Sequence, residues 1–279
     1  MHTIFKFKNL IEMKNILKYN FAFVALALFL TSCNSDDAVI TNVSGTGNLV
    51  LEFDQSYGDN DLILSQANAT SQGETLKIST IKYIVSNIVL TKADGTIFTY
   101  PKNQSYFIVD ESKPSSHVID LTDIPSGDYV KVKFGIGVDQ QQFNLGADGQ
   151  GNFLAEAQAA DLLWSWSAGY KFLAFEGTFT SPIVTSDTSF MVHTGQTGTD
   201  YNYTEVTLDL PTKALVRPTI TPDVHLIADV SKIIDGTNKI KLTDYNGMGM
   251  GAMIMSGAAL PLVTANLNGM FHVDHVHND

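Results

Sequence analysis

Short segments of alternating hydrophobic and polar residues run along most of the chain. They are rich in Val, Ile, Thr, Phe and Tyr and are separated mainly by Gly, Asp and Asn, a pattern typical of antiparallel β-strands. Between two of them, residues 93–95 (Ala-Asp-Gly) predict a tight hairpin, because Asp-Gly readily adopts the positive φ of such turns. The predicted strands are residues 48–53, 80–91, 96–100, 106–110, 118–121, 129–138, 170–179, 189–193, 204–210 and 224–229.

Two segments depart from this pattern. Residues 155–160 are good helix formers and Gly169 is a natural end for a helix, so a short helical segment is predicted near 153–168. Residues 247–263 are rich in Gly, Ala and Met and predict a long loop or an irregular edge segment. The fold class we expect is all-β: a single antiparallel β-sandwich domain over residues 47–279, with long loops.

The N-terminal segment predicts export and lipid attachment. An unbroken apolar run over residues 21–30 follows basic residues. It is too short to span a bilayer but suits a signal peptide. The small residues before Cys33 match a bacterial lipoprotein signal, in which the acylated cysteine becomes the first residue of the mature protein. We expect a signal peptide over residues 1–33 and a tether over residues 34–46. Met13 is a better candidate than Met1 for the first translated residue.

Cys33 is the only cysteine in the chain, which excludes an intramolecular disulfide, a thiolate zinc site and a cysteine nucleophile. The alternative to lipidation, a buried core thiol, would place Cys33 inside a domain rather than at the end of a signal. The acidic stretch at residues 34–37 resembles the signal that routes some bacterial lipoproteins to the cell surface, although a plain solvated tether has the same composition. We therefore expect an outer-membrane lipoprotein, on the periplasmic face or the cell surface.

Charge and motifs exclude several classes of function. The chain carries 29 Asp and Glu against 17 Lys and Arg, a formal net charge of −12, which disfavours nucleic acid and anionic lipid surfaces as partners. Serine-elbow, zincin, P-loop and dinucleotide-binding motifs are missing. Because no spacing among Asp139, Asp148, Asp161 and Glu176 indicates a carboxylate pair, we expect no enzymatic activity.

The residues that stand out chemically are tryptophans and soft metal ligands. Both tryptophans, Trp164 and Trp166, lie in the predicted helical segment, where they would point apart; they are either core fillers or part of a site. Met191 and His193 would share one face of a strand, and four of the eight methionines fall within residues 248–255. Thioethers favour Cu(I), but methionine also fills gaps in cores.

The chain ends in a histidine-rich segment. In an extended conformation His275 and His277 would share one side, with His272 on the other, and clustered neutral imidazoles can chelate copper or zinc. The alternative is a frayed, solvated tail. His117 and His225 are isolated in the sequence and predict partly buried, hydrogen-bonded side chains.

Several blocks of the sequence, taken in order, resemble the MbnP-like proteins. The Trp-x-Trp-x-x-Gly-Tyr block is the most specific of them, and the resemblance runs from about Gly47 to Asp279. The blocks are residues 81–90 (IKYIVSNIVL), 135–139 (GIGVD), 163–177 (LWSWSAGYKFLAFEG), 191–195 (MVHTG) and 226–230 (LIADV).

This resemblance implies an exported, copper-binding β-sandwich that acts in copper acquisition or handling and is related to CorA-type surface proteins. It further implies that Trp164 or Trp166 lies beside a Cu(I) site and is oxidised to kynurenine by a separate dihaem peroxidase of the MauG type. His193 falls in the histidine block. The chain departs from many relatives in having Leu163 where they have Met, and in lacking the paired cysteines that others carry after the His-x-Gly block.

Two hypotheses of function follow. The first is a lipid-anchored copper-binding protein with Trp164 and Trp166 beside the metal. The second is a glycan-binding or adhesion lipoprotein that works with a TonB-dependent receptor. In this case Trp164 and Trp166 of the lipoprotein would stack on sugars together with Tyr201 and Tyr203. A hydrolase has the least support. The candidate metal ligands of the first hypothesis are Met191, His193, His272, His275 and His277.

Overall fold

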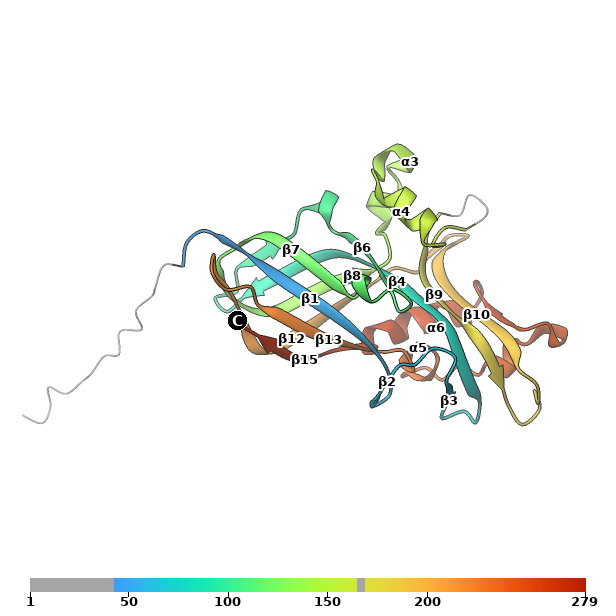
Figure 1. Ribbon diagram of the computed structural model, residues 1–279. Helices are drawn as coiled ribbons and strands as arrows, with labels where there is room; N and C mark the ends of the chain where they lie inside the picture. Colours follow the sequence, from blue (N-terminus) through green and yellow to red (C-terminus); the bar gives the residue numbers. More distant parts are fainter. Residues whose placement is uncertain (1–42, 165–168) are drawn as a thin grey trace, which may run out of the picture. The chain divides into compact units, whose positions relative to one another are not determined.

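The computed structural model describes residues 43–164 and 169–279 (Figure 1). The predicted signal peptide, Cys33 and nearly all of the predicted tether lie outside the described residues, and so does Trp166. Strands account for 51% of the described residues and helices for 18%, which confirms the prediction of an all-β, sandwich-like fold. None of the described helices is both long enough and apolar enough to cross a lipid bilayer.

The smaller of the two sheets is built around the first strand. Its order is β15–β13–β1–β2, and β7 pairs with the first part of β1. The pairing of β1 with β13 is parallel, whereas the other strands of this sheet pair in the antiparallel sense. The strands are β1 (Thr46–Tyr57), β2 (Asn60–Asp61), β7 (Val118–Pro125), β13 (Asp223–Asp229) and β15 (Phe271–His277).

The larger sheet has the order β11–β10–β9–β4–β8–β12, with β14 on β10 and three short strands on the long strand β4. Its pairings are antiparallel except for that of β10 with β14. The strands are β3 (Ala67–Ala69), β4 (Thr75–Lys92), β5 (Ile97–Thr99), β6 (Tyr106–Asp110), β8 (Gly127–Ile136), β9 (Lys171–Thr180), β10 (Thr188–Thr197), β11 (Asp200–Tyr201), β12 (Thr204–Val216) and β14 (Ala252–Ile254).

The helical elements are short and lie in the connections. Figure 1 shows α3 and α4 outside the two sheets, in the connection between β8 and β9. The α-helices are α2 (Gln140–Phe143), α3 (Gly146–Gly149), α4 (Phe153–Ala159), α5 (Lys232–Asp235) and α6 (Ala259–Asn266). The 3₁₀-helices are η1 (Lys102–Gln104), η2 (Pro114–Ser116), η3 (Leu242–Tyr245), η4 (Gly247–Gly249) and η5 (Leu267–Gly269).

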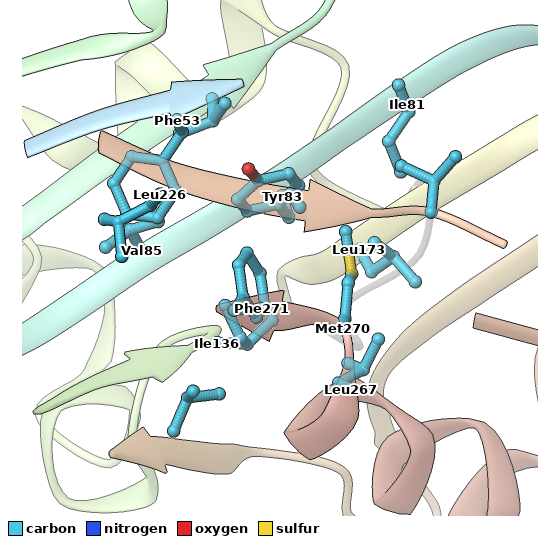
Figure 2. Close-up of a cluster of buried hydrophobic side chains, with 14 of the residues drawn as sticks. Phe53, Ile81, Tyr83, Val85, Ile136, Leu173, Leu226, Leu267, Met270 and Phe271 are labelled. Atoms are coloured by element: carbon cyan, nitrogen blue, oxygen red, sulfur yellow. The ribbon is translucent and has the colours of Figure 1, made fainter. Parts of the chain in front are cut away.

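Aromatic side chains from both sheets meet in the core. Alternation along β1 turns Leu49, Leu51 and Phe53 inward, and all three are fully buried, as expected for a strand with one face on the core. The Phe53 ring packs edge-on against Phe134 of β8 at 5.5 Å between centroids, and Phe271 of β15 packs on Phe134 at 5.2 Å. Figure 2 shows Phe271 beside Tyr83 and Ile136, so the last strand is anchored in the same core as the first.

The strand predictions are confirmed in position, and the differences have local causes. The hairpin at residues 93–95 forms as expected, with Gly95 at a φ of +86°. The predicted loop over residues 247–263 is wrong in part, because it contains β14 and the start of α6. A proline inside this segment, Pro261, argues against a helix there. It is tolerated because it lies in the first turn of α6, where a backbone N–H forms no hydrogen bond within the helix.

Replacing Phe271 with Ala should lower the free energy of unfolding by about 3–5 kcal/mol, because the cavity would open where the two sheets meet. Urea denaturation followed by circular dichroism measures this loss. The control is Ile183→Ala, at a side chain that is 78% exposed, and it should leave the midpoint nearly unchanged. Equal midpoints for the two variants would contradict the role given to Phe271.

Candidate functional site

Trp164 lies beyond the end of helix α4 rather than inside a helix. Helix α4 ends at Ala159, and Asp161 reverses the chain with a φ of +59°. The backbone N–H of Trp164 then donates to the Gly169 carbonyl at 3.0 Å, and Leu163 forms an isolated β-bridge with Tyr170. The prediction that the helix includes Trp164 is therefore wrong; the run of alanines favours a helix only as far as Ala159.

Glycine at position 195 allows Trp164 to pack against β10. A Cβ atom on Gly195 would lie 2.6 Å from the Tyr170 carbonyl oxygen and 3.1 Å from Nε1 of Trp164, which is too close for ordinary contact. Trp164 is only 8% exposed, and its ring lies 5.5 Å from the His193 ring at an angle of 59°. The sequence blocks around Trp164 and His193 therefore meet in space, as the resemblance implies.

His193 forms a buried hydrogen bond to a carboxylate on the neighbouring strand. Glu176 of β9 is paired with Met191 of β10, two residues before His193, so the two side chains share a face and meet diagonally. The His193 Nε2 atom lies 2.7 Å from Glu176 Oε1, and His193 is 3% exposed. Glu176, which the sequence suggested only as a member of a carboxylate pair, is the residue that orients His193.

For a neutral His193, the hydrogen bond to Glu176 selects the tautomer that carries its proton on Nε2. The hydrogen bond from His193 lowers the pKa of Glu176 below its ordinary value, although burial acts in the opposite direction. An ionised Glu176 accepts the Nε2 proton, which leaves a lone pair on Nδ1. Nδ1 is buried and has no hydrogen-bond partner among the described residues. A carboxylate–histidine pair of this kind is the arrangement that orients an imidazole toward a metal ion.

A cavity of about 580 Å³ lies beside this pair. Met255, not Met191, is the methionine that shares it with His193; Met191 pairs across the sheet with Met253 of β14. Met191 keeps the same strand face as His193 but does not line this cavity. Met255 is an additional thioether that the sequence could not place there, because β14 was not predicted. The cavity is lined by Gln158, Asp161, Leu163, Trp164, Lys171, His193 and Met255.

The histidine tail forms a strand, and it adds a partner that the sequence missed. In the register of β13 with β15, His275 is paired with His225 and His277 with Asp223. The nitrogens of His225, His275 and His277 lie within 4.8 Å of one another. His225, predicted to be isolated, therefore belongs to a cluster of three histidines.

A β-bulge changes the alternation in β15. Asp274 is the extra residue between the pairs His225–His275 and Leu226–Val273, so two successive side chains face the same way. Val273 and Val276 both pack against the core. His272 is exposed and faces outward with His275 and His277, whereas simple alternation placed it on the opposite side. It is not part of the three-histidine cluster.

Three of the four carboxylates considered for hydrolysis, Asp139, Asp161 and Glu176, serve other roles. Asp139 caps α2 by accepting from the Gln142 N–H, and it is hydrogen-bonded to Asn87. Asp161 lies 3.4 Å from the Lys171 ammonium, and Glu176 binds His193. Within residues 43–164 and 169–279, no hydrogen bond or ion pair joins two members of this set.

These features define a class of β-sandwich with a buried tryptophan–histidine pair. The family model of MbnP matches residues 46–255, most of the chain, and this chain belongs to the MbnP family. A solved structure, MbnP from Methylosinus trichosporium, is 15% identical with a TM-score of 0.46, and the match covers 76% of this chain and 82% of that one. No curated protein sequence matches the chain.

Replacing Glu176 with Gln should make stability less dependent on acid pH. The pKa of Glu176 lies below its ordinary value of 4.5 in the folded chain. Its ionised form therefore stabilises the fold above that pH, and the contribution is lost as pH falls through the lower folded value. Denaturant unfolding at a series of pH values should show a shallower loss for E176Q than for the wild type.

The matched control is Glu205→Gln, at a half-exposed ion pair with Lys133, and it should keep the wild-type dependence. If E176Q and the wild type lost stability in parallel, the hydrogen bond to His193 would not be the cause of the pKa shift.

Proposed function

We propose that this member of the MbnP family is an exported, lipid-anchored protein that binds copper for acquisition or handling and has no catalytic turnover. The observation that carries the proposal is the buried His193, whose Nε2 is hydrogen-bonded to Glu176 and whose Nδ1 has no hydrogen-bond partner within the described residues. This pair lies inside the part of the chain that matches the family. Copper is the cargo of the protein in this proposal.

The donor types around the cavity suit Cu(I) better than Cu(II). One imidazole and one thioether, from His193 and Met255, face the same cavity, and Cu(I) prefers soft ligands and low coordination numbers. The Lys171 ammonium also lines the cavity, which is less unfavourable for a monovalent ion than for a divalent one. Trp164 covers His193 and restricts the access of water to it.

Trp164 is the tryptophan that we place in the copper site. Its ring packs on His193, so oxidation to kynurenine would change the side chain in direct contact with the metal ligand. The chain has no Cys-x-x-Cys-His haem motif, so the oxidant would be a separate protein, for which a dihaem peroxidase is our candidate. An intact-mass and peptide-map measurement on protein from its native host reads this modification directly.

The glycan-binding hypothesis has weaker support. Trp164 is 8% exposed, and the Tyr201 ring packs on Phe172 at 5.3 Å, so neither offers an open face for a sugar. The Tyr203 hydroxyl accepts a hydrogen bond from Asn87 at 2.9 Å. The burial of Trp164 removes one of the aromatic side chains on which this hypothesis depends.

Replacing His193 with Ala should abolish tight Cu(I) binding at this site, and Met255→Ala should weaken it. Binding is measured under reducing conditions by competition with a chromophoric Cu(I) chelator. Both variants are made in a chain that also carries His275→Ala and His277→Ala, so that the outward-facing imidazoles of β15 do not contribute to Cu(I) binding. The controls are His117→Ala and Met253→Ala. Cu(I) affinity that is the same in the His193 variant as in its control would overturn the assigned site.

Cys33→Ala should remove the predicted lipid anchor. Wild-type protein should appear in the membrane fraction with the mass of an acylated N-terminal cysteine, and the variant should lack that mass. Acylation of the Cys33→Ala protein would contradict the predicted anchor, and so would a wild-type protein that is unacylated and keeps its signal peptide. Neither result would bear on the copper proposal, which the His193 variant tests.

A further inference from the structure

We infer that the outer face of the smaller sheet holds a second metal site, which binds a divalent zinc- or copper(II)-type cation through His225, His275 and His277. This site is separate from His193, on another sheet, and its proposal does not depend on the proposed function. Two of its three histidines lie on β15, beyond the part of the chain that matches the family model.

The strands hold the three imidazoles close together. The rings of His225 and His275 are stacked, with centroids 4.2 Å apart and planes at 18°, and His277 lies edge-on to both at 5.3 and 4.6 Å. His225 comes from β13, and the other two lie two residues apart on the paired strand β15. Adjacent strands of a sheet are rigid supports, and such supports hold metal ligands more accurately than loops do.

The nitrogen atoms have the spacing that a shared ion requires. Nε2 of His275 lies 3.0 Å from Nε2 of His277. Imidazole nitrogens bind zinc at roughly 2.0–2.1 Å, so two ligands on a tetrahedral ion lie about 3.3 Å apart. All three histidines are at least partly exposed, which leaves their rings free to rotate over the remaining difference. Three imidazoles leave a fourth position on a tetrahedral ion for water or a carboxylate.

A carboxylate next to the cluster selects the tautomer that a metal needs. Nδ1 of His275 lies 2.7 Å from Oδ2 of Asp274. A neutral His275 that donates its Nδ1 proton to Asp274 presents the Nε2 lone pair toward His277. Because the bulge inserts Asp274 beside His275, which keeps its pairing with His225, the two groups are neighbours on the outer face.

The carboxylates on this face favour a bound cation. Glu52 and Asp223 approach Nε2 of His225 at 3.2 and 3.6 Å, and Asp274 approaches His275. Within the described ranges these three carboxylates form no ion pair with Lys or Arg, and Oδ1 of Asp223 is buried without a hydrogen-bond partner. Three anionic groups around neutral imidazoles are most strongly stabilised by a bound divalent ion.

The test uses Zn²⁺, which has no redox chemistry, on the full chain after treatment with a chelator. Competition with a chromophoric zinc indicator should show one tight equivalent in the wild type. His225→Ala, His275→Ala and His277→Ala should each weaken binding by more than about 100-fold, and Asp274→Asn, which changes only the outer support, by about tenfold. Cu²⁺ should respond to the same variants, since it binds such ligands more tightly than Zn²⁺ does.

His272→Ala is the matched control, because His272 lies on the same strand and face but outside the cluster; it should bind Zn²⁺ like the wild type. His193→Ala should also retain Zn²⁺ binding, so failure of this site and failure of the Cu(I) site are distinguishable. If His225→Ala bound Zn²⁺ with wild-type affinity, the imidazoles of β15 alone would be the ligands, and the proposed site would be overturned. A loss of affinity in His272→Ala as large as that in the cluster variants would also overturn it.

A second measurement guards against loss of folding in the variants. The triple variant carries His225→Ala, His275→Ala and His277→Ala together. Without metal, its circular dichroism spectrum should be the same as that of the wild type. Zn²⁺ should raise the Tm of the wild type, because an ion that binds only the folded state stabilises it, and should leave the Tm of the triple variant unchanged. A similar rise in both proteins would overturn the proposal.

Discussion

Burial of Phe271 is the interaction on which both candidate sites depend. Its ring packs against Phe134 and Tyr83 of the larger sheet, so the end of the chain is held in the core and β15 pairs with β13 along its length. Without that anchor, the histidines of the tail would have no fixed neighbours. The same contact joins the two sheets, and the larger one carries β9 and β10 with Glu176 and His193.

The two sites differ in the way that burial and charge are combined. His193 is covered by Trp164 and has a single carboxylate partner, an environment in which a soft monovalent ion loses little by leaving water. The outward-facing cluster has three imidazoles and three carboxylates in contact with solvent. It can therefore compensate a double positive charge. One β-sandwich thus presents two ligand sets that suit different oxidation states of the same element.

Much of the fold could be predicted from local pattern, and much of the site could not. Alternation located β1 and β13 because each has one face in the core. The meeting of Trp164 with His193 followed only from a family resemblance, since the loop after α4 and strand β10 are paired through long-range contacts. The roles of Glu176, Met255 and His225 depend on strand register between distant segments, and a single sequence contains no local signal for register.

The bulge in β15 has a consequence for how this chain can vary. Without Asp274, the segment Phe271-His272-Val273-His275-Val276-His277 would alternate strictly, with the same valines inward and the same histidines outward. Gain or loss of this one codon therefore leaves the sheet and its imidazoles in place and changes only the carboxylate that supports His275. Metal affinity on this face is adjustable by an insertion or deletion of a single residue, a kind of change that a strand interior rarely tolerates.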